Sequence, residues 1–159
     1  MAKMLYAGED PRFVARRICI CAAEDVGNAD PLALVLANAA LQISEFVGMP
    51  EARIPLAQAV IYVACAPKSN ASYLAIDNAL GDMEKKRVQE VPDALKDANY
   101  SGAEKLGHGK DYKYAHEFPG HYVAQDYTRK PVKYFQPTEI GYEAKIKERL
   151  LKLRNLQKK

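Results

Sequence analysis

Residues 30–48 read DPLALVLANAALQISEFVG, and this stretch sets the pattern of the fold. Asp30 and Pro31 supply an N-cap carboxylate and a first-turn proline, whose missing N–H has no helical partner to lose. Gly48 closes the segment. The apolar residues between these ends recur at helical spacing and share one face: Leu32, Leu36, Ala39, Ala40, Ile43 and Val47. We therefore expect a helix with one broad apolar face.

Similar signals divide the rest of residues 1–99 into short helices. Residues 2–7 have helical composition and end at a glycine, and an Asp-Pro pair begins a second helix that leads toward residue 27. A regular helix is expected from about Arg53 to residue 65. It is apolar on every face, which predicts the central and most buried helix. Ser69 caps a further helix.

The remaining residues differ in kind. Residues 100–140 hold glycines, prolines and scattered aromatic residues without a helical period, which predicts an extended arm that has room for a small hairpin. Residues 141–159 predict a basic helix with an apolar stripe of Tyr142, Ile146, Leu150 and Leu153. We thus expect one all-α domain over residues 1–159: a compact multi-helix bundle (1–99), the aromatic and glycine-rich arm (100–140), and the C-terminal helix.

Length and composition exclude several classes. The chain has 159 residues, of which 48% are hydrophobic and 27% charged, so it can bury a core and is not a disordered protein. Three cysteines in this length indicate a reducing compartment. No run approaches the ~20 apolar residues of a membrane helix, and the first residues lack a signal-peptide pattern. We expect a soluble, cytoplasmic protein. Because the chain opens inside a helix without an N-cap, we also expect a fragment of a longer protein.

Charge is distributed unevenly along the chain. Residues 1–99 carry 10 Lys/Arg and 13 Asp/Glu, whereas residues 100–159 carry 13 and 7. Seven of the ten tyrosines also lie in the second part. This combination favours either contact with a nucleic-acid backbone or a solvated arm whose tyrosines pack on its own core. The candidate DNA-contacting residues lie on the C-terminal helix: Lys145, Lys147, Arg149, Lys152 and Arg154.

A search for catalytic chemistry gives weak patterns. The segment Gly102–Gly109 lacks the Lys and Ser/Thr that a P-loop needs after its second glycine, and no apolar strand precedes it. His108, His116 and His121 match no zinc-finger spacing. No serine sits in a nucleophile elbow. The residues therefore argue against an autonomous enzyme, with no catalytic residue, cofactor or metal site in the chain.

Charged and sulfur-bearing residues of the second helix form the other candidate cluster. Arg16 and Arg17 are followed by Glu24 and Asp25 at a spacing where charges gather. A structural ion network is the main interpretation. The alternatives are a general acid/base pair, for which no nucleophile or metal companion lies nearby, and contact of the arginines with a partner subunit. Cys19-x-Cys21 is no Cys-x-x-Cys redox motif, and buried, inert thiols are expected.

Long linked strings of the sequence resemble the C-terminal region of the MgsA/RarA family of replication-associated recombination ATPases. These belong to the AAA+ superfamily and are bacterial relatives of the Werner-helicase-interacting protein. The matching strings are MLYAGEDPRFVARR (4–17), AEDVGNADP (23–31), EFVGMPEAR (45–53), AQAVIY (57–62), APKSN (66–70), KLGHG (105–109), YKY (112–114) and GYEAKIKERL (141–150). The resemblance covers essentially the whole chain.

This resemblance implies a helical oligomerisation domain, similar to the collar domain of clamp loaders, that joins family members into homotetramers. The family's ATP and magnesium site lies in an N-terminal P-loop domain, so no nucleotide-binding residue can be carried onto this chain. The longer protein would act on DNA at stalled forks or gaps, near single-strand-binding protein and associated with the nucleoid.

Two other classes remain open from the residues alone. One is an autonomous small helical nucleic-acid-binding protein that uses the basic C-terminal helix and the tyrosine-rich arm. The other is an enzyme built around the histidine segment. A stable oligomer would favour the assembly module, whereas a monomer with salt-sensitive DNA binding would favour the first alternative.

Overall fold

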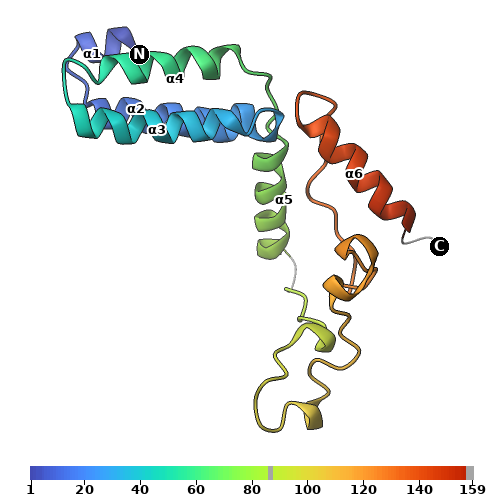
Figure 1. Ribbon diagram of the computed structural model, residues 1–159. Coiled ribbons are helices and arrows are strands. Elements are labelled where there is room, and N and C mark those ends of the chain that lie inside the picture. Colours follow the sequence, from blue (N-terminus) through green and yellow to red (C-terminus); the bar gives the residue numbers. More distant parts are fainter. Residues whose placement is uncertain (86–87, 157–159) are drawn as a thin grey trace. The chain divides into compact units, whose positions relative to one another are not determined.

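The computed structural model describes residues 1–85 and 88–156, and every regular element in that part of the chain is helical (Figure 1). The expected all-α class is confirmed. Contacts group the chain into two compact units. Unit 1 comprises Met1–Asn78 and Phe135–Glu148, and unit 2 comprises Ala79–Tyr134 and the chain from Arg149. This grouping crosses the expected boundaries at 99 and 140, and the single domain stays a prediction.

Four of the α-helices lie wholly in unit 1. They are α1 (Ala2–Tyr6), α2 (Pro11–Cys21), α3 (Leu32–Val47) and α4 (Arg53–Cys65). The Asp10 carboxylate accepts a hydrogen bond from the backbone N–H of Arg12 at 2.8 Å, and Asp30 accepts one from Leu32 at 3.1 Å. Both side chains satisfy amides that the first helical turn leaves unpaired. The expected helix starts, including that of α4 at Arg53, are confirmed.

Helices α2, α3 and α4 pack around one core, which α1 borders. The fully buried members are small or medium-sized apolar side chains: Val14, Ala15, Ala22, Val26, Ala33, Ala37, Leu56 and Ala59. Alanines at the contacts allow the helix axes to approach closely, because little side-chain volume separates them. The core therefore uses few of the large apolar residues of α3.

A tight turn connects α2 to α3 and receives the start of α5 (Ala71–Lys85). It consists of a π-helical turn, Ala22–Val26, and a 3-10 turn, Gly27–Ala29. The Ser69 amide donates to the Asp25 carbonyl at 2.8 Å. Gly27 has φ +51°, and a Cβ there would lie 2.6 Å from the Ser69 carbonyl oxygen, so only glycine fits. Ser69 also caps α5, as expected, by accepting the Ala71 amide at 3.3 Å.

The start of α6 (Glu143–Leu156) is held against the same turn. The Tyr142 amide donates to the Ala29 carbonyl at 2.7 Å. Glu143 is fully buried, and its Oε2 accepts from the amide and the hydroxyl of Thr138 at 2.8 and 2.9 Å. These contacts stabilise the turn that leads into α6.

Unit 2 contains irregular backbone with short 3-10 turns at Asp93–Leu95, Glu104–Leu106, Ala115–Glu117 and Pro119–His121. The arm was predicted to allow a small hairpin, but its described residues form these 3-10 turns and no strands. Two glutamine amides instead mimic strand pairing. Gln89 accepts from the Lys130 amide at 2.7 Å and donates to its carbonyl at 3.3 Å. Gln125 does the same to Lys113, at 3.2 Å in both directions.

None of the helices in the described part of the chain combines the length and the apolar character that a membrane crossing requires.

Candidate functional site

Helix α3 buries its small residues and exposes its large ones. Its buried face is a stripe of Ala33, Ala37, Ala40 and Ser44. The large apolar side chains occupy a second stripe, with exposed fractions of 49% for Leu32, 61% for Val35, 48% for Ile43 and 91% for Phe46. The expected face is only partly the exposed one: Leu32, Ile43 and Val47 are exposed, Leu36 and Ala39 are half-buried, and Ala40 is buried. A stripe of this kind on a water-facing helix marks an interaction surface.

Helix α4 repeats the pattern. Leu56, Ala59 and Val63 point into the core, whereas Ile54 and Ile61 are 58% and 63% exposed. The prediction that this is the most buried helix is therefore wrong: α4 has three buried residues and α3 has four. The apolar residues of α4 divide between the side that the core covers and a side that is exposed in the described part of the chain.

Helices α3 and α4 form an antiparallel hairpin that is tied at both ends (Figure 1). At one end the Tyr62 hydroxyl donates to the Asp30 carboxylate at 2.7 Å. This carboxylate, with partial burial, raises the pKa of Tyr62. At the other end the Ser44 hydroxyl donates to the Ala52 carbonyl at 3.3 Å.

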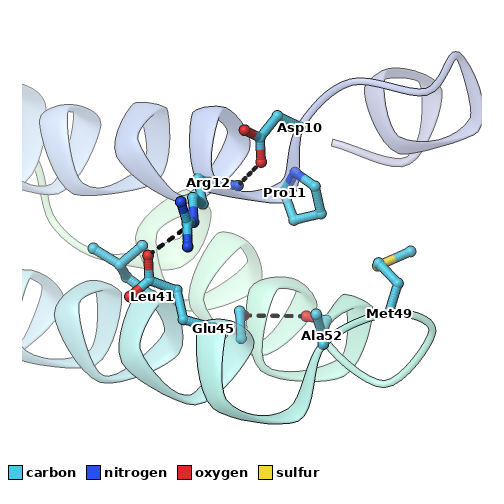
Figure 2. Close-up of a pocket in the computed structure, with 9 residues that line it drawn as sticks. Asp10, Pro11, Arg12, Leu41, Glu45, Met49 and Ala52 are labelled. Carbon is cyan, nitrogen blue, oxygen red and sulfur yellow. Dashed lines mark hydrogen bonds and ion pairs between the residues drawn. The ribbon is translucent and has the colours of Figure 1, made fainter.

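Helix α2 packs on one flank of this hairpin. Figure 2 shows Glu45 reaching α2, where its carboxylate lies 3.1 Å from the Arg12 guanidinium. The exposed side chains of Val35, Ile43 and Phe46 lie away from that flank, by the helical repeat of 3.6 residues per turn, whereas Leu41 lies on the α2 side. We call this surface, formed by the α3 stripe and the exposed side of α4, the hairpin face.

A small hollow of about 190 Å³ lies between α2 and α3, on the flank away from the hairpin face (Figure 2). Its charged side chains already have partners: Asp10 caps α2, and Arg12 pairs with Glu45. The hollow therefore offers little unsatisfied polarity to a small ligand.

The candidate cluster on α2 is dispersed. Arg16, Arg17, Glu24 and Asp25 are all exposed, and neither arginine forms an ion pair with either carboxylate. Arg16 lies 5.1 Å from the centroid of the Phe13 ring. Asp25 instead accepts the Cys21 thiol at 3.0 Å. The structural ion network does not form, and a subunit contact stays a prediction for these residues.

The three cysteines differ in environment. Cys19 and Cys21 are half-buried, and Cys65 is exposed at the end of α4. The hydrogen bond to Asp25, and then burial, raise the pKa of Cys21, while burial raises that of Cys19. A raised pKa keeps a thiol protonated and unreactive, as expected for these two.

The basic residues of α6 fall into two groups. Lys145, Arg149 and Lys152 are exposed at positions i, i+4 and i+7, which share one face of the helix. Lys147 is half-buried and bonds Glu139 at 2.8 Å, and Arg154 is also half-buried. The predicted apolar stripe of Ile146, Leu150 and Leu153 is partly buried, whereas Tyr142 is 50% exposed.

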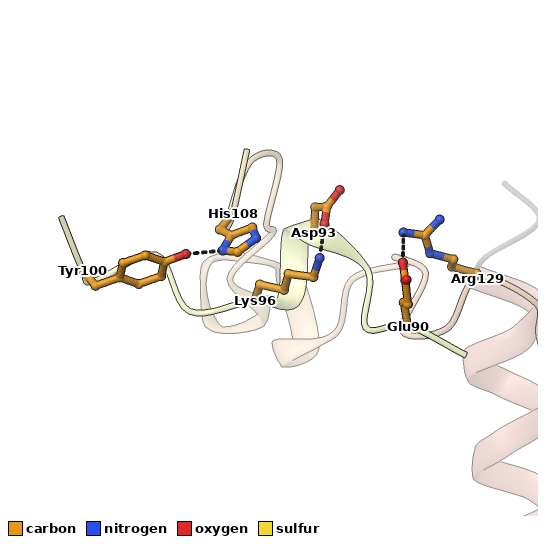
Figure 3. A network of polar contacts seen from close by, with 6 residues as sticks. All are labelled: Glu90, Asp93, Lys96, Tyr100, His108 and Arg129. Atoms are coloured by element: carbon orange, nitrogen blue, oxygen red, sulfur yellow. Dashed lines mark hydrogen bonds and ion pairs between the residues drawn. The ribbon is translucent and has the colours of Figure 1, made fainter. Parts of the chain in front are cut away.

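The histidines of unit 2 contact aromatic rings. His108 Nδ1 lies 2.6 Å from the Tyr100 hydroxyl, near the ion pairs Asp93–Lys96 and Glu90–Arg129 (Figure 3). The rings of His116 and His121 lie with centroids 4.9 Å apart. Among residues 1–85 and 88–156, no group of three or more potential ligands could hold a metal ion. The glycine-rich segment 102–109 forms a 3-10 turn, without a strand before it or a helix after it in the described chain.

The sequence carries a signal for which face of α3 is buried. The spacing Ala-x3-Ala-x2-Ala-x3-Ser, from residue 33 to 44, already marks a narrow face for close helix contact. The large residues lie beside that face rather than on it. Phe46, the most exposed of them, was missed for this reason.

Comparisons with known proteins show which family the sequence matches. Residues 1–154 match the family described as MgsA AAA+ ATPase C terminal. An uncharacterised AAA-domain-containing protein of Mycobacterium tuberculosis is 47% identical over the whole chain. Replication-associated recombination protein A of Bacillus subtilis is 45% identical over 93% of the chain, and that of Escherichia coli K12 is 42% identical over 94%.

The chain spans only about a third of these relatives: 36% of the first two and 34% of the third. A relative named ATPase WRNIP1, from Dictyostelium discoideum, is 38% identical over 82% of the chain. The family match covers nearly all of the residues, and the identities far exceed chance similarity. The chain therefore belongs to the MgsA/RarA family of AAA+ ATPases, whose C-terminal region it matches.

Proposed function

We propose that this chain is the oligomerisation module of an AAA+ ATPase of replication-associated recombination and repair, and that it assembles as a homotetramer. The single observation that carries the proposal is the exposed apolar stripe of α3: the helix buries the small residues Ala33 and Ala37 and exposes the large residues Val35 and Phe46. Burial of apolar area contributes roughly 25 cal/mol per Å², so covering this surface favours association. Most soluble oligomers are closed symmetric homo-oligomers, in which such a face is buried against another copy.

The longer protein would supply the chemistry. ATP and magnesium would bind its N-terminal domain, and it would act on DNA at stalled forks or gaps, near single-strand-binding protein. The printed names of the bacterial relatives, replication-associated recombination protein A, support this setting. The module itself would contribute assembly rather than catalysis.

Direct DNA contact by α6 is a second candidate role. Lys145, Arg149 and Lys152 are exposed along one face of the helix, and Lys145 lies 5.8 Å from the Tyr142 ring centroid. Such a row can neutralise successive phosphates. In a tetramer, four weak contacts would reinforce each other through effective concentration.

Light scattering of the purified chain at micromolar concentration tests the assembly. We expect an oligomeric mass for the unchanged protein and a smaller mass for Val35→Lys, because a buried ammonium without a partner is costly. Asn38→Lys is the matched control: it adds the same charge to the same exposed helix, outside the stripe. A monomeric mass for the unchanged chain would refute the proposal.

A further inference from the structure

Phe46 is the most exposed large apolar side chain of the α3–α4 hairpin. It lies in the last turn of α3, and 91% of its surface is accessible. An aromatic side chain buries roughly 150–250 Å² when it is covered. The Phe46 ring projects from the apolar stripe as a knob, which can insert into a pocket on another molecule.

A hollow of suitable chemistry lies at the other end of the hairpin. It is open, has a volume of about 640 Å³, and has walls from Ile61, Tyr62, Cys65 and Pro67, with Asp30 at its edge. An apolar cavity of roughly 150 Å³ can hold a benzene molecule. The hollow therefore has room for a phenyl ring.

The knob and the hollow are related by the geometry of the hairpin. The tie between Asp30 and Tyr62 marks the hollow end, and the tie between Ser44 and Ala52 marks the Phe46 end. Both features lie on the flank away from α2. A two-fold axis that lies in the plane of the hairpin face, and bisects the line from Phe46 to the hollow, turns two copies face to face and exchanges these two features. It would place each Phe46 over the hollow of the other copy, as isologous pairing requires.

The hairpin face carries few charges. Only four charged residues lie between positions 30 and 65, and one of them, Glu45, is directed toward Arg12 of α2. Asp30, at the hollow end, accepts from the Tyr62 hydroxyl, and the exposed Glu51 and Arg53, of opposite charge, lie together at the Phe46 end. A highly charged partner would find little to pair with on this face, whereas the apolar face of a second copy matches it.

The available area is also sufficient. The exposed fractions of Leu32, Val35, Ile43, Phe46, Val47, Ile54 and Ile61 lie between 42% and 91%. At ~150–200 Å² for each whole side chain, they amount to roughly 600–800 Å². This approaches the roughly 800 Å² per partner of a standard protein interface.

From these observations we infer that Phe46 of one copy inserts into the hollow beside Ile61 and Cys65 of a second copy, and reciprocally, across a two-fold axis. The inference rests on the proposed self-association and adds its register. Phe46 is then a buried anchor of the interface. Phe46→Ala should raise the dimer dissociation constant by about 30-fold or more, as for other buried aromatic anchors. Tyr6→Ala, which removes a 96% exposed side chain from α1, should leave it unchanged.

Thiol cross-linking tests the register directly. In a chain carrying Cys19→Ser and Cys21→Ser, the variant Phe46→Cys is treated with a short bis-maleimide, and the linked peptides are identified by mass spectrometry. We expect a link between position 46 of one copy and Cys65 of the other, which is lost when Cys65→Ser is added. Tyr6→Cys in the same background is the matched control and should give no link to Cys65.

The outcomes separate the two proposals. A link between two thiols at position 46, or no link in a chain that light scattering shows to be oligomeric, would overturn the register and leave self-association standing. A monomeric mass for the unchanged chain would overturn both. If Phe46→Cys alone is monomeric, a double-mutant cycle of Phe46→Ala with Ile61→Ala decides. Coupling between the two positions is expected, and strictly additive losses would contradict the inserted Phe46.

Discussion

The hydroxyl of Tyr62 donates to the carboxylate of Asp30 at 2.7 Å and joins the last turns of α4 to the residue that caps α3. One carboxylate therefore serves both helices: Oδ1 receives the Leu32 amide, and Oδ2 receives the phenol. This hydrogen bond holds together the end of the α3–α4 hairpin where the hollow lined by Ile61, Tyr62 and Cys65 lies.

This hydrogen bond predicts a dependence of stability on alkaline pH. The Asp30 carboxylate raises the pKa of Tyr62 in the folded chain above its unfolded value of about 10. Because the folded pKa is the higher one, the contribution is complete below pH ~10 and is lost as pH rises through the folded pKa. The melting temperature should therefore fall more between pH 9 and pH 11 for the unchanged chain than for Tyr62→Phe. Tyr6→Phe, on exposed α1, should follow the unchanged chain, and identical pH profiles for all three would contradict the prediction.

Two glycine substitutions should have opposite effects on stability. Gly141 has φ +57°, and a Cβ there would collide with the Ala29 carbonyl, which already accepts the Tyr142 amide. Gly141→Ala should lower the free energy of unfolding by ~2 kcal/mol or more, through positive-φ strain and the collision. Gly81 lies within α5 with nothing near its Cβ position, so Gly81→Ala should raise it by ~0.5–1 kcal/mol. Urea unfolding measures both, and an equal response at the two sites would refute the close approach of residue 141.

The N-terminus of α2 allows a comparison of a helix cap with a surface ion pair. Asp10→Ala removes the acceptor of the Arg12 amide and should cost ~1 kcal/mol. Arg12→Gln removes the ion pair with Glu45, in which the Arg12 side chain is 74% exposed and that of Glu45 45%. This change should lower the free energy of unfolding by at most ~0.5 kcal/mol, because solvent screens exposed charges. Thermal unfolding at low and high salt should show that only the second loss shrinks as salt increases. A larger loss for Arg12→Gln than for Asp10→Ala would reverse this ranking.

The helices were predictable because their boundaries are local. Asp10, Asp30 and Ser69 each bond an amide two residues ahead, so the residue type and its position carry the signal. The start of α4 at Arg53 followed from proline chemistry in the same way. The arm was harder, because its described backbone is held by pairs far apart in sequence. Gln89 with Lys130 and Gln125 with Lys113 cannot be read from either partner alone.

The candidate surface was only partly predictable, for a different reason. Hydrophobic periodicity identifies an apolar face but does not say whether the chain's own core or another molecule covers it. On α3, Ala33 and Ala37 occupy the face that packs on the chain's own core, because close helix packing favours small residues. Val35 and Phe46 are therefore exposed to solvent. Glu24 and Asp25 failed as ion partners because the π-helical turn breaks the regular spacing that the prediction assumed.

The basic face of α6 gives a prediction about DNA binding. Replacing Lys145, Arg149 and Lys152 by glutamine should reduce the salt dependence of single-strand binding, with the slope of log K against log salt changing by roughly 2, because each lost phosphate contact contributes about 0.7. The matched control replaces Lys105, Lys110 and Lys113 by glutamine. These lysines are exposed on the arm, and their replacement removes the same total charge. We expect a smaller change there, because these lysines lie on irregular backbone that also carries Glu104, Asp111 and Glu117. Fluorescence anisotropy at several salt concentrations measures both slopes, with light scattering as the check on assembly. An unchanged slope for the α6 variant, with the oligomer intact, would leave α6 a purely structural helix, whereas a larger change for the arm variant would assign the DNA contact to the arm.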